Sequence, residues 1–576
     1  MQMQCPLCDS KQLKKHGKTA YGNLKYRCEV CSNIFARKTD TNFCPPQINF
    51  LKFKQKYSFQ NTVLNCQKQI HNLKQLTSRK SQPCKTLSES IKLWSVELVA
   101  TRLIEYIMQA KQINSAVVLV FGIGFALVSI FSNISPFYHK TDVQTFHEWA
   151  NCFAQCGREI YLACHYDNSP TPGLIVAYPS IGMLVSGGFI YIIKLFAPLT
   201  DWEVINNIFR SYLFLFDLFN LFLFITIARM MQFAKPVLIG LMLFLIPSNL
   251  AGGAVWGQID NVALTFCLIS SIALIKSWLI PQESYAKSKW KAIAWLILAA
   301  VSLSLFILVK QLSIFSVPYF MVAFSITAIK FWQHWQHKGL IWIGVVLAIF
   351  AATFYGFDHI LSVSDKFFGS SYYYIWAGGD IDSRYIMSAN GFNIWIFLGR
   401  DPSSSSRIPF DLLWDKDVLS VSPYDLGIAS YVIWSLFLLG ILLVLAKKFL
   451  RESLVKPSET HPKFMAFLFL YYGLSQLGFN LLLTGTHERY LFTGYPFLLL
   501  AGSWFFTHRL VFSWQLLGLC FLSAFIYGCF VFSIIGPLPG IFFAFSRHEF
   551  LASLHLFLLV LLADAWIKIY RADSKT

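Results

Sequence analysis

Residues 428–446 read Ile-Ala-Ser-Tyr-Val-Ile-Trp-Ser-Leu-Phe-Leu-Leu-Gly-Ile-Leu-Leu-Val-Leu-Ala, and Lys447 and Lys448 follow directly. The stretch has no charged side chain. At about 1.5 Å per residue, it is long enough to cross the roughly 30 Å hydrocarbon layer of a bilayer as one helix. Similar apolar runs recur from Ala116 to Ile567. The sequence therefore predicts an all-α polytopic membrane protein.

Composition supports the same fold class. The 576-residue chain is 55% hydrophobic, 17% aromatic and only 14% charged, which is too much apolar surface for one water-soluble core. We expect about twelve transmembrane helices, at residues 115–133, 206–228, 236–256, 261–278, 292–310, 312–329, 339–357, 428–446, 464–483, 490–507, 510–533 and 550–567.

One further apolar segment, residues 174–197, decides the topology. It contains Pro179, Gly182, Gly187 and Gly188, so it is predicted to be re-entrant or interfacial instead of spanning. On that assumption a set of 17 Lys and Arg residues all lies on one side, which the positive-inside rule makes cytoplasmic: Arg229, Lys235, Lys276, Lys287, Lys289, Lys291, Lys330, Lys338, Lys447, Lys448, Arg451, Lys456, Lys463, Arg509, Lys568, Arg571 and Lys575. Both termini are then predicted to be cytoplasmic.

The N-terminal segment is a separate, basic module. Residues 1–112 hold 19 Lys and Arg against 6 Asp and Glu, so 19 − 6 = 13 of the formal charge of +18 precedes the first span. Cys5-Pro-Leu-Cys8 and Cys28-Glu-Val-Cys31 have the spacing of two zinc knuckles. We therefore divide the chain into a β-structured zinc ribbon (1–40), a basic linker with an amphipathic helix (41–112) and a multi-span domain (113–576). The remaining cysteines are scattered and predict no disulfide framework.

The predicted topology places the polar motifs of the multi-span domain together on the outer face. These motifs are Asp142 in the first loop, Tyr178-Pro179, Trp256-Gly-Gln258-Ile-Asp260, Lys310-Gln311, Ser388-Ala-Asn390-Gly-Phe-Asn393-Ile-Trp395 and Thr486-His487-Glu488-Arg489-Tyr490. In this order and spacing, residues 115–576 resemble the polytopic GT-C glycosyltransferases, particularly bacterial mannosyltransferase-like members. Two positions depart from the family pattern: Ala177 stands where an acid usually precedes Tyr-Pro, and Thr141 stands where a second acid often accompanies the first-loop Asp.

The resemblance implies a sugar donor carried on a polyprenyl phosphate and an outer-face active site in a bacterial plasma membrane. Asp142 is the candidate general base, since partial desolvation at the interface makes a carboxylate more basic. The alternative is that Asp142 caps a helix beginning at Val143. Lys310, His487 and Arg489 are the candidates for binding the departing phosphate. The alternative for Lys310 and Arg489 is that their side chains reach lipid headgroups.

The other candidate site residues offer neutral or acidic groups to the donor. Tyr178, Gln258 and Asp260 could contact sugar or phosphate, and structural pairing within the bundle is the alternative for the last two. Asn390 and Asn393 could bind sugar hydroxyls, and the alternative is that the Asn-Gly pair at 390–391 forms a turn. A divalent ion at Asp142, His147 and Glu148 is possible but not favoured, because the segment lacks a compact acid pair.

The first 40 residues resemble the zinc ribbon of some transposases, with structural zinc expected on Cys5, Cys8, Cys28 and Cys31. No transposase catalytic domain follows, so the ribbon could be a fusion remnant. Its basic side chains could contact nucleic acid, but anionic lipid of the inner leaflet is the favoured partner.

The function predicted from the sequence is transfer of a hexose, with mannose favoured by the resemblance, to a glycan, lipid or protein acceptor. The alternatives are a transporter or flippase for a lipid-linked sugar and a membrane-tethered regulator that acts through the zinc ribbon.

Overall fold

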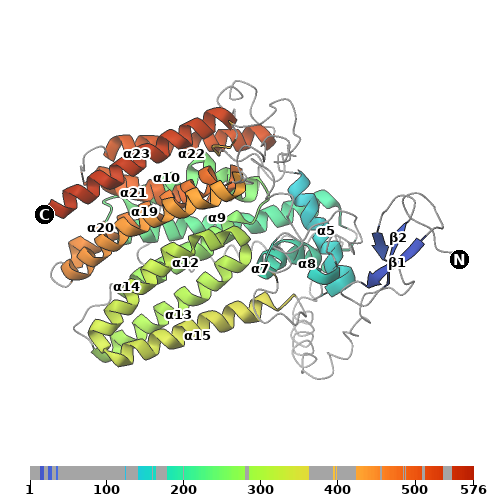
Figure 1. The fold of residues 1–576 in the computed structure, drawn as a ribbon, viewed down its shortest axis with the longest axis horizontal. Helices are drawn as coiled ribbons and strands as arrows, with labels where there is room; N and C mark the ends of the chain where they lie inside the picture. The colour runs from blue at the N-terminus through green and yellow to red at the C-terminus, as the bar shows by residue number, and fades with distance from the viewer. Residues whose placement is uncertain are drawn as a thin grey trace, which may run out of the picture. The chain divides into compact units, whose positions relative to one another are not determined.

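The computed structural model divides into two units, Met1–Ser90 and Ile91–Thr576, which are described separately (Figure 1). The described residues are 13–18, 24–28, 34–36, 124, 140–157, 160–163, 178–198, 200–278, 285–361, 371, 393–395, 397, 423–453, 457–483, 486, 488–508, 513–535 and 548–575. The predicted amphipathic helix and the predicted span at 115–133 lie outside them, apart from Gly124.

The N-terminal unit contains a small antiparallel sheet. Strands β1 (Leu13–Lys18), β2 (Leu24–Cys28) and β3 (Ile34–Ala36) pair in the order β1-β2-β3, and Leu13 lies opposite Cys28. Cys28 ends β2, whereas Cys5, Cys8 and Cys31 lie outside the described residues. The zinc site therefore stays a prediction.

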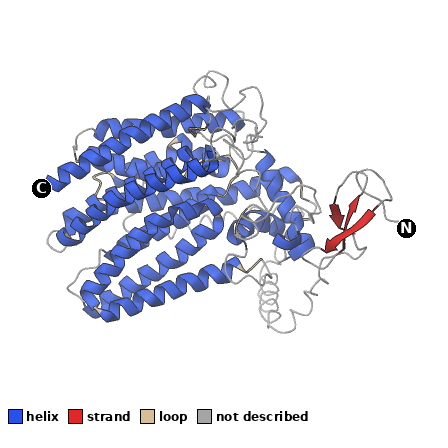
Figure 2. Ribbon diagram, in the orientation of Figure 1, coloured by secondary structure: helices blue, strands red, loops and turns tan. Residues whose placement is uncertain are grey.

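All the regular secondary structure in the described part of the second unit is helical (Figure 2). Its helices are α5 (Lys140–Cys156), α6 (Ile160–Ala163), α7 (Ser180–Met183), η2 (Leu184–Gly188), α8 (Phe189–Phe196), α9 (Trp202–Met230), α10 (Pro236–Leu245), α11 (Pro247–Leu250), η3 (Ala251–Val255), α12 (Asp260–Trp278), α13 (Tyr285–Val309), η4 (Gln311–Ser316), α14 (Val317–Trp335), α15 (His337–Asp358), α19 (Pro423–Glu452), α20 (Pro457–Leu482), η7 (Glu488–Leu491), α21 (Gly494–Thr507), α22 (Ser513–Ile535) and α23 (His548–Lys575).

Eight of the described helices are long and apolar enough to cross a membrane, and a bent pair brings the total to nine. The polytopic membrane class is therefore confirmed, while the count of twelve stays a prediction. The predicted spans 490–507 and 510–533 correspond to α21 and α22. The segment predicted not to span forms α7, η2 and α8, an apolar helix shorter than the spans.

The predicted continuous span at 236–256 is wrong in detail. It is broken into α10 and the segment Pro247–Val255, which meet at 57°. Pro247 starts the second part, and a proline lacks the N–H that would continue the helical hydrogen bonds. Gly253 then leaves helical geometry, at φ −106° and ψ −121°. The break leads the chain directly into the Trp256–Asp260 motif.

The helices differ in how much of their surface is buried inside the bundle. In the apolar stretch of each helix that is long enough to span, 83% of the α12 residues and 94% of the α20 residues are buried. The corresponding shares are only 11% in α15 and 22% in α19. The outer helices expose apolar side chains such as Ile341, Leu347, Ile433 and Leu436. This pattern fits a bundle whose interior is packed protein and whose surface is solvated by lipid.

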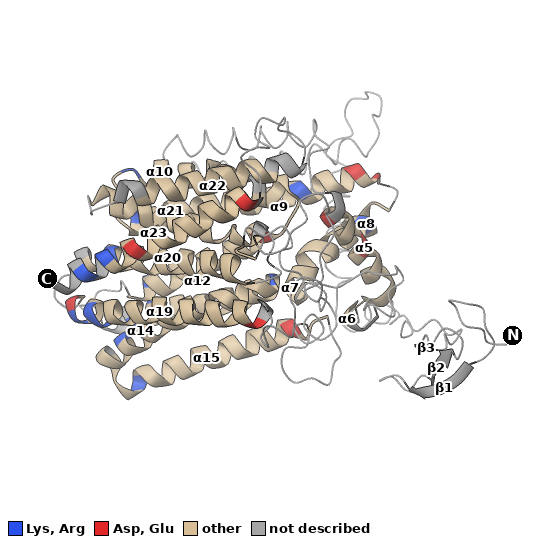
Figure 3. Ribbon diagram, turned by 45° about the horizontal axis from the view of Figure 1, so that its top comes forward, with Lys and Arg blue, Asp and Glu red and all other residues tan. Residues whose placement is uncertain are grey.

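Helix α12 joins two ends of the bundle that differ chemically. At its first residue, Asp260 pairs with Lys310; this end, with Asp142, Tyr178 and Trp256, is called the site end below. At its last residue, the Trp278 ring packs on Phe449. That opposite end is called the lysine end, and its defining cations are Lys276, Lys289 and Lys330. Figure 3 shows Lys and Arg gathered toward the end of the helical unit where the C-terminus lies.

Candidate functional site

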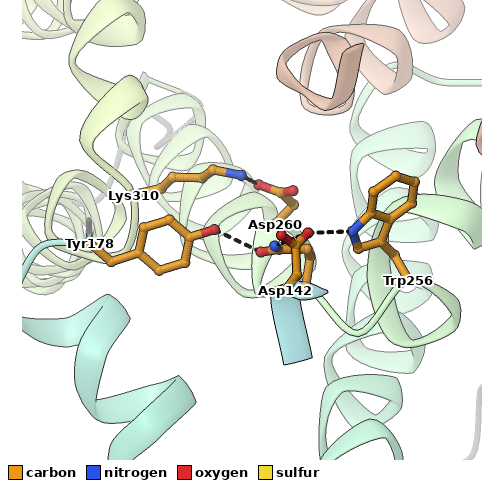
Figure 4. A network of polar contacts seen from close by, with 6 residues as sticks. Asp142, Tyr178, Trp256, Asp260 and Lys310 are labelled. Atoms are coloured by element: carbon orange, nitrogen blue, oxygen red, sulfur yellow. Dashed lines mark hydrogen bonds and ion pairs between the residues drawn. The ribbon is translucent and has the colours of Figure 1, made fainter. Parts of the chain in front are cut away.

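Asp142 lies in the first turn of α5 with its side chain half-buried. The Trp256 indole Nε1 donates to Asp142 Oδ2 at 2.7 Å, and the Gln258 amide Nε2 donates to the same oxygen at 2.6 Å (Figure 4). Because α5 already includes Lys140, the alternative that Asp142 caps a helix starting at Val143 is wrong. The carboxylate instead joins two motifs that lie 114 residues apart in sequence.

The short segment between η3 and α12 turns both donors toward α5. Gly257 adopts φ +86°, a left-handed conformation that suits glycine. A Cβ added there would lie 2.7 Å from a methyl group of Val143. A larger residue would therefore strain the backbone and push α5 away, which explains why a glycine separates Trp256 from Gln258.

Tyr178 extends this network toward α13. Its hydroxyl donates to Gln258 Oε1 at 2.8 Å, and its backbone carbonyl accepts from the Tyr161 hydroxyl at 2.6 Å. Four residues later, a Cβ on Gly182 would lie 2.1 Å from the Val309 carbonyl oxygen, so α7 packs directly on the end of α13. Gln258 is thereby held at both ends of its amide group, with its oxygen on Tyr178 and its nitrogen on Asp142.

Lys310 and Asp260 form a buried ion pair. The Lys310 ammonium donates to Asp260 Oδ1, and the two side chains are only 7% and 4% exposed (Figure 4). The ammonium also lies 5.9 Å from the ring centres of Tyr178 and Tyr490. Lys310 and Asp260, both predicted to contact substrate, therefore bind each other, which is the structural pairing given as the alternative for Asp260. A ligand would have to share this ion pair or displace one of its partners.

His147 faces α9 and not Asp142. Its Nε2 lies 2.7 Å from Asn206 Oδ1, and its ring packs against Trp202 at a tilt of 33°, with centroids 3.6 Å apart. Burial lowers the pKa of His147 from 6.5 to about 4, against a smaller opposing effect of the bond to Asn206, so the imidazole is neutral at pH 7. Glu148 accepts from Gln144 on its own helix. Across the described residues, no group of three or more His, Cys, Asp or Glu side chains could hold a metal ion.

The Asn393 segment docks on the end of α20. The Asn393 amide donates to the Leu483 carbonyl at 3.1 Å and to Thr486 Oγ1 at 3.0 Å, while Trp395 Nε1 donates to the Leu482 carbonyl at 2.8 Å. Asn393 thus has a structural role in joining its segment to the end of α20, and its sugar contact stays a prediction. Arg489 lies in η7, next to Tyr490, whereas His487 and Asn390 lie outside the described residues.

Two charged residues within α9 were missed by the sequence analysis. Arg210 and Asp217 are each 6% exposed, and both contact the backbone of Ala254 in the broken helix. Their sequence signal was present, because ionisable residues inside an apolar span are rare and are functional candidates by default.

Cys152 on α5 was also misjudged. It is disulfide-bonded, which the scattered spacing of the cysteines did not predict. Cys156, Cys267, Cys520 and Cys529 form no disulfide.

A comparison of the chain with protein-family models and with curated proteins finds no match. Functional inference for this chain therefore depends on its own residues and their geometry.

Proposed function

We propose that the chain is an inverting membrane glycosyltransferase that uses a polyprenyl-phosphate sugar as donor and Asp142 as general base. The observation on which this depends is the half-buried Asp142 carboxylate, to which Trp256 and Gln258 both donate. A carboxylate oriented by two donors, with buried polar groups on adjoining helices, suits proton removal from a bound hydroxyl.

In the proposed reaction the acceptor hydroxyl transfers its proton to the Asp142 carboxylate as its oxygen forms a bond to the anomeric carbon. The bond from that carbon to the phosphate oxygen breaks on the opposite face, and polyprenyl phosphate leaves with the electron pair. Lys310 lies beside this network, with its ammonium 5.9 Å from the centre of the Tyr178 ring. The incoming phosphate would compete with Asp260 for Lys310, while Arg489 and His487 supply further positive or donor groups.

Two features support an outer position for the site end. The lysine end has cations beside aromatic rings, including Lys276 at 4.3 Å from the Trp295 ring and Lys330 at 4.7 Å from the Phe449 ring. Cytoplasmic ends are rich in Lys and Arg. The disulfide at Cys152 suits an oxidising compartment, which lies outside the bacterial plasma membrane. We therefore assign both termini to the cytoplasm.

The transferred sugar is proposed to be a hexose, with mannose favoured, and the acceptor a glycan, lipid or protein. The N-terminal ribbon is proposed to hold structural zinc through Cys5, Cys8, Cys28 and Cys31. Anionic lipid is its favoured contact over nucleic acid.

A lipid-linked sugar transporter is the second candidate, because one observation favours it. The 57° break between α10 and Pro247–Val255 is the kind of discontinuous helix that transporters use at substrate sites. Transporters with inverted repeats have such breaks in corresponding positions of both halves. The described residues contain one bent pair, which makes the enzyme the better supported candidate.

The decisive experiment incubates purified protein in lipid with a panel of polyprenyl-phosphate hexoses and candidate acceptors, and analyses glycan and lipid products. We expect transfer by the wild type and at least a thousandfold loss in Asp142→Asn, because the base is removed while the shape is kept. Glu203→Gln is the matched control, since Glu203 is an exposed acid in the first turn of α9.

The outcomes separate the candidates. Transfer retained in Asp142→Asn removes Asp142 from the mechanism. Movement of intact lipid-linked sugar across proteoliposomes without transfer supports the transporter. Deletion of residues 1–112 leaves an enzyme active and inactivates a ribbon-dependent regulator.

A further inference from the structure

We propose that Asp217 and Arg210 are positioning residues for Asp142: they hold the backbone of Ala254 and so fix the segment that presents Trp256 and Gln258. This inference rests on the proposed function and extends it to residues in the interior of the helix bundle.

Both backbone polar groups of Ala254 are bound by charged side chains of α9. The Ala254 N–H donates to Asp217 Oδ2 at 3.1 Å, and Arg210 Nε donates to the Ala254 carbonyl at 3.0 Å. The other Asp217 oxygen accepts from Asn261 Nδ2 at 3.0 Å. One carboxylate thus connects the segment before the Trp256–Asp260 motif with Asn261 just after it.

The broken helix needs such outside partners. Gly253 leaves helical geometry within η3, and residues 256–259 form turns before α12 begins, so backbone groups around the break lose some of their regular intrahelical partners. Gly253 allows the carboxylate to approach, because a Cβ there would lie 2.4 Å from Asp217 Oδ1. The Asp217 side chain therefore packs directly against the Cα of the residue where the helix breaks.

The held residue lies close to both donors of the site. Ala254 precedes Trp256 by two residues and Gln258 by four, and both of those side chains end on Asp142 Oδ2. A shift of the Ala254 backbone would therefore move both donors together, and misplacement by about 1 Å can cost roughly a hundredfold in rate.

Neutral contacts already join α9 to α12 without this charged pair. Thr265 Oγ1 donates to Asn220 Oδ1 at 2.8 Å, and Asn220 Nδ2 donates to the Asn261 carbonyl at 3.0 Å. The contact that Arg210 and Asp217 make and these neutral residues do not is the contact with Ala254, which connects the two side chains with the broken segment.

The test combines amide hydrogen exchange with steady-state transfer kinetics on the full-length protein in lipid nanodiscs. For Asp217→Asn, we expect amides in residues 253–258 to exchange at least tenfold faster. We expect kcat to fall roughly tenfold to a hundredfold, with the KM for the lipid donor within about twofold. The double variant Asp217→Asn/Asn261→Asp exchanges donor and acceptor across the pair and should recover at least part of both losses.

Thr265→Val is the matched control, since it removes a buried hydroxyl of the same network that does not contact Ala254. Unchanged exchange at 253–258 in Asp217→Asn, or an equal effect of Thr265→Val, overturns the proposal. If Asp217→Asn does not fold, Arg210→Lys decides the question, because it keeps the charge and removes the Nε donor. If the wild type transfers no sugar, the proposed function fails, and the exchange data alone decide whether Ala254 is held in this way.

Discussion

Charged side chains have different surroundings at the two ends of α12. At the lysine end, Lys276 and Lys330 lie over aromatic rings at 4.3 and 4.7 Å. At the site end, Lys310 is buried and paired with Asp260. Cations beside aromatic rings are typical of anchoring at a membrane interface, where the charge remains close to water. A buried pair has no such benefit, and a role in the proposed reaction would account for the charges that the site end retains.

The largest effect is expected from breaking the buried pair. Asp260→Ala leaves Lys310 buried without its carboxylate and should lower the free energy of unfolding by about 3–5 kcal/mol, whereas Asp260→Asn with Lys310→Met should cost much less. At the lysine end, Lys276→Met should cost about 1 kcal/mol or less. Denaturant titration in detergent measures all three, and equal losses at both ends would remove the contrast.

Removal of the Cys152 disulfide is expected to have the next largest effect on stability. Cys152→Ser should lower stability by about 2–4 kcal/mol when the wild type is kept oxidised, and by much less once it is reduced. Cys156→Ser is the control on the same helix, because Cys156 forms no disulfide. Alkylation before and after reduction, read by mass, tests the bond itself. Alkylation of Cys152 without prior reduction would contradict both the disulfide and the assignment of the site end to an oxidising compartment.

Close packing at the broken helix predicts a smaller change. Gly253→Ala places a methyl group 2.4 Å from Asp217 Oδ1 and should destabilise the protein by about 1–3 kcal/mol. Gly440→Ala in α19 meets nothing within 4 Å and should be neutral or stabilising, since alanine is the better helix former. Thermal unfolding of the two variants in the same detergent provides the comparison, and similar melting temperatures would show that the contact at Gly253 relaxes readily.

The smallest effect concerns pH at the site end. Burial lowers the pKa of His147 from 6.5 to about 4, so between these values the unfolded chain binds a proton that the folded protein excludes. Stability should therefore fall by about 1 kcal/mol as the pH falls from 6.5 to 5.5. His147→Gln cannot titrate and should lack this share of the pH dependence. Identical pH profiles for the two proteins would show that His147 is readily protonated in the folded state.

Part of the candidate site was predictable from the sequence. Gln258, Asp260 and Lys310 were singled out as motif residues, and the structure brings them close to Asp142 and Tyr178. The pairing of Lys310 with Asp260 was not predictable, because no local pattern in a sequence specifies which buried charges meet. The contacts of Arg210 and Asp217 depend on the broken helix, whose bend was itself not expected.

By itself, the sequence determined that the chain is a membrane protein of many helices and where most of those helices lie. These properties follow from local hydropathy, since every apolar run must be long enough to satisfy its backbone within lipid. Only the tertiary structure decided the partners of Asp142, which lie 114 and 116 residues away, and the attachment of Ala254 to α9. Such contacts depend on how helices pack and on where one helix breaks, and these follow from the fit of many side chains at once.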